Sequence, residues 1–263
     1  GCRLLDRVGK KVPLTQAGEQ FFQRVDKIFG EMILARAELD QLGEWGRGRL
    51  RVGASAAACQ YILPSVLREF QKEFPKCRLS IEPGDTKEIV ESLRANTIDV
   101  AVTLEPERES DFSFSPLFTD ELMFLVNPKH PWAEARRAVR MEIPREQYIL
   151  YLRNSRTFEQ IENYFRAEKM AIKSVIDMGS MSAIKELVKL GLGVTILAPW
   201  VAQNELTKKS LVALPLGRRK LKRQWGVLYW KERPMGWAED TFIKLCQSGA
   251  RQFAASNGLR AHV

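Results

Sequence analysis

The feature that most restricts the fold of this chain is a heptad pattern of apolar residues near its N-terminus. Thr15 occupies a position suited to a helix N-cap, and the apolar residues after it are spaced alternately four and three positions apart. They are Phe21, Val25, Ile28, Met32, Ala35, Leu39 and Leu42. Such spacing is typical of a helix that packs along a narrow seam on another helix, whereas a helix packed in its own domain usually carries a broader stripe. The sequence therefore predicts a dimerisation helix over residues 15–46, with packing inside the same subunit as the less favoured alternative.

After residues 45–48 the pattern changes to short apolar runs that alternate with helical stretches. The first series predicts strands at 50–54, 78–82 and 99–104, and helices at 61–74 and 89–95. The second series predicts strands at 149–152, 175–178 and 194–197, and helices at 158–169 and 183–190. A strand at 225–230 and a helix at 238–247 follow. Alternating strands and helices predict an α/β fold, and the two series predict two lobes with a ligand site in the cleft between them.

Composition argues against several classes of protein. The apolar runs are far shorter than a membrane span needs, and no export signal is visible. The four cysteines form no CxxC pair and the chain has only two histidines, so no metal site, cofactor or hydrolase triad is expected. The net charge of +9 is concentrated in residues 1–51 and 217–233, where contact with a polyanion competes with a role in solubility. We interpret the basic stretch 217–223 as a solvated turn, with a DNA or subunit contact as the alternative.

Several phrases in fixed order resemble a known family. The opening LLDRVGKKVPLTQAGEQF resembles the end of the winged helix-turn-helix domain of LysR-type transcriptional regulators, where LTxAG opens the linker helix. The resemblance continues to about residue 250 through GRLRVGAS, YILPSVLREFQKEFP, IDVAV, FLVNPKHPWA and IKELVKLGLGVTILAPWV. It implies a cytoplasmic DNA-binding regulator that dimerises through the linker helix, forms dimers or tetramers, and binds a small co-inducer. A periplasmic-type solute-binding protein is the alternative, although it explains neither the heptad nor the basic N-terminal turn.

The resemblance also implies a division of the chain. Residues 1–14 correspond to the wing, and the recognition helix of the family would lie before residue 1. Residues 15–46 form the linker helix, 47–117 with 217–250 the first lobe, 118–216 the second lobe of a periplasmic-binding-protein-like effector domain, and 251–263 a C-terminal tail. In the wing, three basic residues are expected to contact DNA phosphates without reading bases. These are Arg7, Lys10 and Lys11.

By the same resemblance, turns at the ends of strands line the effector cleft. The expected contacts are Ser55, Ala56, Ala57, Thr86, Thr103, Arg153, Ser155, Arg156, Thr157, Ser180 and Met181. The turn at 153–157 carries two arginines and two hydroxyls before a helix, a combination that suits an anionic metabolite. Alternatives remain: Ser55, Thr86 and Ser180 each suit a helix cap, and the arginine pair could be solvated. No histidine or cysteine pair falls at these turns, so binding rather than catalysis is expected.

Overall fold

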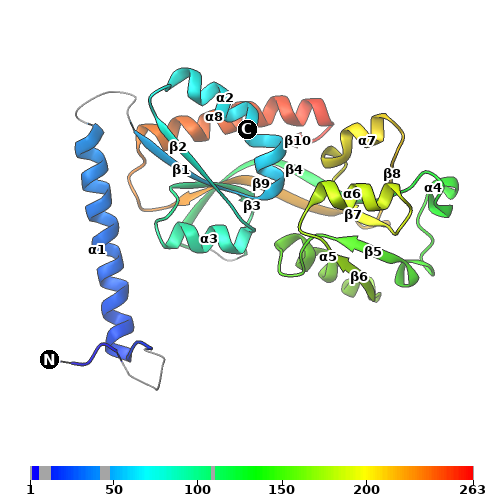
Figure 1. The fold of residues 1–263 in the computed structure, drawn as a ribbon, viewed down its shortest axis with the longest axis horizontal. Coiled ribbons are helices and arrows are strands. Elements are labelled where there is room, and N and C mark those ends of the chain that lie inside the picture. Colours follow the sequence, from blue (N-terminus) through cyan, green and yellow to red (C-terminus); the bar gives the residue numbers. More distant parts are fainter. Residues whose placement is uncertain (1, 6–12, 42–47, 108–109, 263) are drawn as a thin grey trace.

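The N-terminal part of the protein is a long helix that stands away from the body. The computed structural model describes residues 2–5, 13–41, 48–107 and 110–262, with side chains for all of these except 33–41 and 174. Helix α1 (Gln16–Gln41) extends over 26 residues (Figure 1). As predicted, Thr15 caps it, because its Oγ1 accepts a hydrogen bond of 3.0 Å from the Gly18 amide. Leu5 and Leu14 form an isolated antiparallel bridge, and the basic turn with Arg7, Lys10 and Lys11 lies outside the described residues.

Helix α1 exposes a stripe of large apolar side chains. The heptad residues Phe21, Ile28 and Met32 are more than half exposed, and Val25 is half-buried. Phe22 and Phe29, which the heptad reading omitted, are each 58% exposed and lie beside the same stripe. The stripe is therefore wider than the predicted seam. Of the remaining heptad residues, the side chains of Ala35 and Leu39 and the whole of Leu42 fall outside the described part of the chain.

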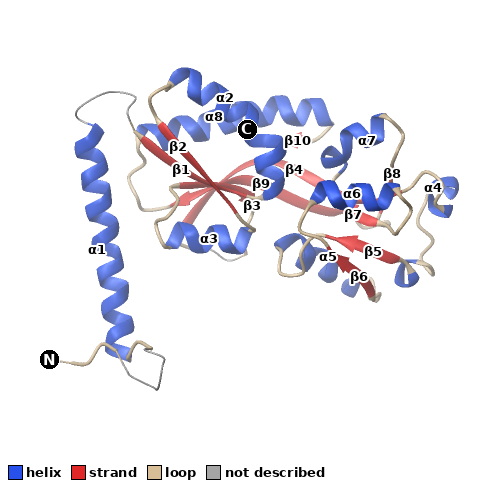
Figure 2. Ribbon diagram, in the orientation of Figure 1, coloured by secondary structure: helices blue, strands red, loops and turns tan. Residues whose placement is uncertain are grey.

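The first lobe is a mixed sheet with helices on both faces (Figure 2). Its central strand β1 (Arg49–Ala54) pairs in parallel with β2 (Arg78–Pro83) and β3 (Val100–Leu104), as the sequence predicted. Beyond β3 the sheet continues antiparallel through β9 (Leu221–Trp230) and β4 (Phe112–Val126). The helical elements are η1 (Ala58–Ile62), α2 (Leu63–Glu73), α3 (Thr86–Arg94) and α8 (Trp237–Asn257).

Alternation along β3 divides the core of this lobe into two layers. Val100 and Val102 join the larger apolar cluster, which includes Phe70 of α2 and Phe242 of α8. Ala101 points to the opposite face and joins the cluster around Leu93 of α3. Every residue of β3 is buried, as expected for a strand covered on both faces.

The second lobe is smaller and is built on the far half of β4. Strands β7 (Thr195–Leu197) and β8 (Val212–Pro215) pair with β4 on residues 123–126, and β5 (Gln147–Leu150) pairs in parallel with β6 (Ser174–Asp177). A bridge between Tyr148 and Val194 joins the two pairs of strands. The helical elements are α4 (Pro131–Ala135), η2 (Ile143–Arg145), α5 (Arg156–Ala167), α6 (Met181–Lys189), η3 (Pro199–Ala202) and α7 (Gln203–Thr207).

Strand β4 belongs to both lobes. Its 15 residues form one continuous strand across the division that the sequence predicted between residues 117 and 118. The strand pairs with β9 as far as Leu122, and with β7 and β8 from Met123 onward. At the C-terminus, residues 251–257 were expected in a tail, but they complete α8, and β10 (Arg260–Ala261) pairs with β4. The helix continues because Ala250 and Ala254 keep its buried face apolar. Within the described residues, no helix has both the length and the apolar character needed to cross a bilayer.

Candidate effector site between the lobes

The two lobes contact each other through polar groups at the N-terminus of α5. Ser155 caps this helix, since its buried Oγ accepts a hydrogen bond of 3.2 Å from the Phe158 amide. The next amide, that of Arg156, donates to a carboxylate from the other lobe: Asp85, at 3.1 Å to Oδ1 and 3.3 Å to Oδ2. A helix N-terminus favours such a negative charge. The anion position that the sequence predicted here is therefore occupied by a side chain of the protein.

Asp85 is also the cap of α3, a position that the sequence suggested for Thr86. Its Oδ1 accepts a hydrogen bond from the Lys87 amide, while Glu88 Oε2 accepts one of 2.8 Å from the Asp85 amide, which completes a capping box. Thr86 was wrong as the cap because it is already the first helical residue. Burial raises the pKa of Asp85, against the opposing effect of the amides of Arg156 and Lys87.

Three ion pairs surround this contact. The guanidinium of Arg156 lies 2.9 Å from Glu107 and 3.4 Å from Glu159, and Lys87 lies 3.3 Å from Glu159. Burial acts to raise the pKa of Glu159, yet Lys87 and Arg156 hold it below its usual value. The positive charge of Arg156 is therefore largely balanced by carboxylates. Its Nε is buried and has no hydrogen-bond partner among the described residues.

The remaining expected contacts of the first lobe lie at the ends of β1 and β3. Thr86 and Thr103 are buried, and their hydroxyls are 2.9 Å apart in a hydrogen bond. The hydroxyl of half-buried Ser55 accepts a long hydrogen bond of 3.4 Å from the Ala58 amide, which agrees with the capping alternative. Ala56 is half-buried and Ala57 is buried in the first turn of the same helix.

In the second lobe, Arg153 turns away from Arg156. It is 56% exposed, donates to Asp177 at 2.8 Å, and lies 5.6 Å from the ring centre of Phe158. Ser180 caps α6, with its Oγ accepting a hydrogen bond of 3.3 Å from Ala183, and Met181 is half-buried behind it. The two arginines predicted to act together are thus separated.

Thr157 connects the α5 N-terminus to the strands that join the lobes. Its hydroxyl accepts a hydrogen bond of 2.9 Å from Arg223 on β9, and Arg223 forms a buried ion pair with Asp120, directly opposite on β4. The indole N–H groups of Trp200 and Trp225 each donate to Asp120 at 2.9 Å. Sequence reasoning missed this cluster, because it assigned Arg223 to the solvated turn.

Other residues of the basic stretch 217–223 also form ion pairs and ring contacts that the solvated-turn interpretation did not predict. The guanidinium of Arg219 lies 4.4 Å from the ring centre of Tyr164 and pairs with Glu168 at 3.1 Å. Lys220 pairs with Glu121 at 2.8 Å and remains 62% exposed. The solvated interpretation is wrong for buried Arg223, whereas Arg219 and Lys220 are exposed although each has a carboxylate partner.

A second polar contact joins the lobes near η1. The Tyr61 hydroxyl donates to the Val201 carbonyl at 2.9 Å, and the buried Lys185 donates to the same carbonyl at 2.9 Å and to Tyr61 at 3.3 Å. Glu205 lies 3.0 Å from Lys185. Burial acts to raise the pKa of Glu205, but the hydrogen bond from Lys185, a backbone hydrogen bond and the charges of Lys185 and Lys189 together hold it below its usual value.

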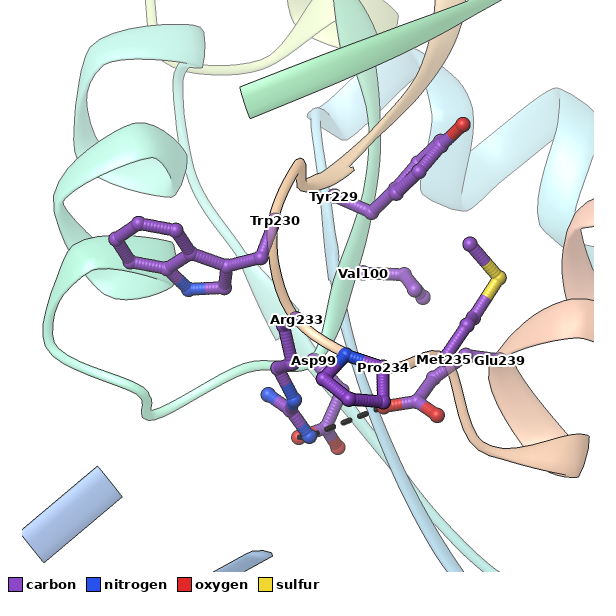
Figure 3. Close-up of a pocket in the computed structure, with 8 residues that line it drawn as sticks. All are labelled: Asp99, Val100, Tyr229, Trp230, Arg233, Pro234, Met235 and Glu239. Carbon is purple, nitrogen blue, oxygen red and sulfur yellow. Dashed lines mark hydrogen bonds and ion pairs between the residues drawn. The ribbon is translucent and has the colours of Figure 1, made fainter. Parts of the chain in front are cut away.

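Two cavities lie elsewhere on the first lobe. Figure 3 shows the smaller, of about 10 Å³, where Arg233 lies between Asp99 and Glu239 beside Trp230 and Met235. This volume suffices for about one water molecule. The larger is a groove of about 710 Å³ between α2 and α8. None of the expected effector residues lines either cavity, and the described residues contain no cluster of histidine, cysteine and carboxylate side chains suited to a metal ion.

Sequence reasoning missed two side chains of the interlobe contact, Glu107 and Glu159. On sequence alone, Asp85 would repel an anion unless Lys87 offset its charge. Burial, together with the charges of Asp85 and Glu88, raises the pKa of the Tyr151 phenol. A carboxylate in one turn complements the N-terminus of a helix in another turn. The sequence does not show that the two turns lie close together in the fold.

Comparison with known proteins identifies the family to which this architecture belongs. The family model for the LysR substrate binding domain matches residues 44–251. Among full-length relatives, the RuBisCO operon transcriptional regulator of Allochromatium vinosum is 26% identical over the whole chain and 84% of its own length. The transcriptional dual regulator GltC of Bacillus subtilis is 26% identical over 92% of this chain and 80% of its own length.

Solved structures share the same fold. The effector binding domain of QuiR in complex with shikimate superposes with a TM-score of 0.67 at 20% identity, covering 78% of this chain and 98% of that one. The Synechocystis PCC6803 CcmR regulatory domain in complex with 2-PG gives a TM-score of 0.68 at 23% identity, covering 77% and 97%. The fold and the interlobe site therefore define a two-lobed effector-binding regulator with an N-terminal helix. The chain belongs to the LysR family of transcriptional regulators, which bind DNA, sense small-molecule effectors and form oligomers.

Proposed function

We propose that this chain senses a small anionic metabolite that binds between the lobes at the N-terminus of α5. The observation that carries the proposal is that the Arg156 amide already holds a carboxylate, at 3.1 Å and 3.3 Å. One further donor of the same residue, Arg156 Nε, is buried and has no hydrogen-bond partner among the described residues. An unpaired buried donor of this kind favours a ligand that accepts a hydrogen bond from it. Ser55, Thr157 and Ser180 belong to the same proposed site.

The second part of the proposal concerns assembly and mechanism. Six apolar side chains of the stripe on α1 are exposed or only half-buried. This exposure supports packing of the stripe against α1 of a second subunit. The wing residues Arg7, Lys10 and Lys11 would contact DNA phosphates. Because the relatives are regulators, we infer that the protein acts in the cytoplasm by binding and not by catalysis, and that effector binding changes the packing of dimers on DNA.

The link between the site and the connecting strands supports this mechanism. Thr157 hydrogen-bonds to Arg223, and Arg223 pairs with Asp120 across β4 and β9. A ligand that shifts the first turn of α5 therefore acts on a group anchored in β9 and β4, of which β4 continues into the second lobe. Coupling of this kind requires that the ligand bind one arrangement of the lobes more tightly than the other.

The test separates the Arg156 amide from its side chain. Arg156 is the first residue of α5, a position that tolerates proline, and Ser155 before it has φ −78° and ψ 149°, which proline also accepts. Arg156→Pro removes the amide N–H and the guanidinium, whereas Arg156→Ala removes only the guanidinium. Calorimetric titration with inorganic phosphate and with acetate should show binding by the wild type and by Arg156→Ala, and none by Arg156→Pro. Equal affinity of the two variants would contradict the proposal.

A further inference from the structure

Asp85 performs two tasks that can be separated. Within its own lobe it caps α3, through the Lys87 amide and the capping box with Glu88. Across the cleft, both of its oxygens accept a hydrogen bond from the Arg156 amide. The cap needs only an acceptor close to the backbone, while the second contact needs the full reach of the carboxylate to the other lobe.

The contact across the cleft uses the same N–H that an anionic effector would use. One amide proton cannot serve two carboxylates at full strength, so the side chain and the ligand exclude each other there. Among the residues that the structure describes, the charges around it do not offer the ligand another cation: Arg156 is balanced by Glu107 and Glu159, and Lys87 is paired with Glu159. An incoming anion must therefore replace Asp85.

We propose that Asp85 is an internal substitute for the effector, whose carboxylate occupies the α5 N-terminus in the ligand-free protein, holds the lobes together and is displaced by the anionic group of the ligand. The identity of the displacing ligand rests on the proposed function above. The internal contact itself does not, because it is defined by side chains of this chain alone.

The contacts of Asp85 allow a ligand to displace its carboxylate from the Arg156 amide. Asp85 keeps its capping box when it leaves Arg156, so α3 stays intact. The neighbouring interlobe ion pairs are exposed on at least one side, with Lys87 at 65% and Glu107 at 64%, and such pairs contribute little. Burial also opposes ionisation of Asp85, while Glu88 repels its negative charge. The hydrogen bond to the Arg156 amide is thus the main polar restraint on this side of the cleft.

Displacement sets a requirement on the ligand. The apparent affinity of any anion is reduced by the fraction of molecules in which the Arg156 amide is occupied. A hydrogen bond to a charged group is worth enough to lower that affinity by about tenfold. An effective ligand therefore needs a carboxylate or phosphate together with further groups that contact the cleft, and a simple anion binds weakly.

Two substitutions separate the tasks of Asp85. Asp85→Ser keeps a good helix cap but is too short to reach Arg156, so the interlobe contact is lost with α3 preserved. Asp85→Asn keeps both the cap and the reach and removes the charge. The first measurement uses no ligand: amide hydrogen exchange followed by NMR. Exchange at Arg156 should be about tenfold faster in Asp85→Ser than in the wild type, with the amides of α3 unchanged. Asp85→Asn should retain most of the protection.

The second measurement is affinity for inorganic phosphate and, separately, for acetate, which distinguishes the two anion chemistries. Asp85→Ser should bind at least one of them about tenfold more tightly than the wild type. Unchanged exchange at Arg156 in Asp85→Ser overturns the proposal, and so does weaker anion binding by that variant. Faster exchange without anion binding by any variant supports the internal contact and counts against the proposed function alone.

Discussion

The buried ion pair between the two connecting strands predicts a large and specific loss of stability. Asp120 has a fully buried side chain and accepts four N–H hydrogen bonds, two from Arg223 and one each from the indoles of Trp200 and Trp225. In Asp120→Asn only one side-chain oxygen remains to accept these hydrogen bonds. The new NH₂ group is itself a donor and lies opposite N–H donors. Arg223, whose side chain is 6% exposed, then retains a positive charge with no carboxylate beside it.

The size of the loss follows from this arrangement. Removing one partner of a buried ion pair costs about 3–5 kcal/mol, because the other charge remains desolvated. The matched control is the next residue on the same strand. Glu121 pairs with Lys220 at 2.8 Å, but Lys220 is 62% exposed, so Glu121→Gln should cost about 1 kcal/mol or less. Both variants remove one carboxylate charge from β4, and they differ chiefly in burial.

The assay is urea unfolding followed by far-ultraviolet circular dichroism, with the free energy of unfolding taken from the midpoint and slope. A double variant, Asp120→Leu with Arg223→Met, should recover only the part of the loss that comes from the unpaired charge of Arg223, because the indole N–H groups of Trp200 and Trp225 still lose their acceptor. If Asp120→Asn is no less stable than Glu121→Gln, the reasoning about this cluster is refuted.

Three further predictions use other parts of the chain. Ile28→Glu in the exposed stripe of α1 should shift the protein toward monomer in sedimentation, whereas Gln23→Glu, on the opposite face of the helix, should not. Burial raises the pKa of Cys59, so iodoacetamide at neutral pH should label exposed Cys2 well before Cys59, as followed by mass spectrometry; equal rates would contradict the burial. The folded state raises the pKa of Asp85 above its ordinary 3.8, so its contribution to stability is greatest below that value and falls as pH rises through the raised pKa. As the pH rises from about 4 to 7, the free energy of unfolding of the wild type should therefore fall relative to that of Asp85→Asn. Parallel curves of unfolding free energy against pH for the two proteins would refute this.

Much of the fold was accessible from the sequence because its patterns are local. Strand β3 is apolar except for Thr103 and α2 carries apolar residues at helical spacing, so their types follow from periodicity. The glycines of the phrase GLG at 191–193 indicate a tight turn, and both adopt φ angles that favour glycine, 77° and 159°. The full lengths of β4 and α8 did not follow, because polar residues such as Asp120 lie at buried positions that only tertiary partners satisfy.

The position of the effector site stays a prediction, but some side-chain roles around it can be compared with the sequence. Ser180 caps a helix, as its place before a helical stretch suggested, and Ser155 also acts as a cap. The pairing of Thr86 with Thr103, and that of Arg153 with Asp177, depends on side-chain directions that spacing does not encode. The width of the α1 stripe was missed for a simpler reason: a strict heptad reading leaves out Phe22 and Phe29, although both are exposed next to it.

Strand β4 also determines which gene fragments of this protein can yield a folded product. A fragment limited to residues 123–215 would keep the pairing of β7 and β8 with β4 but would begin in the middle of β4, without the residues that pair with β9. The two lobes are thus joined by one continuous strand, β4, and by a second connection at residues 216–220, between β8 and β9, that belongs to no strand. A change in the relative orientation of the lobes would therefore bend or twist β4 near residues 122–123.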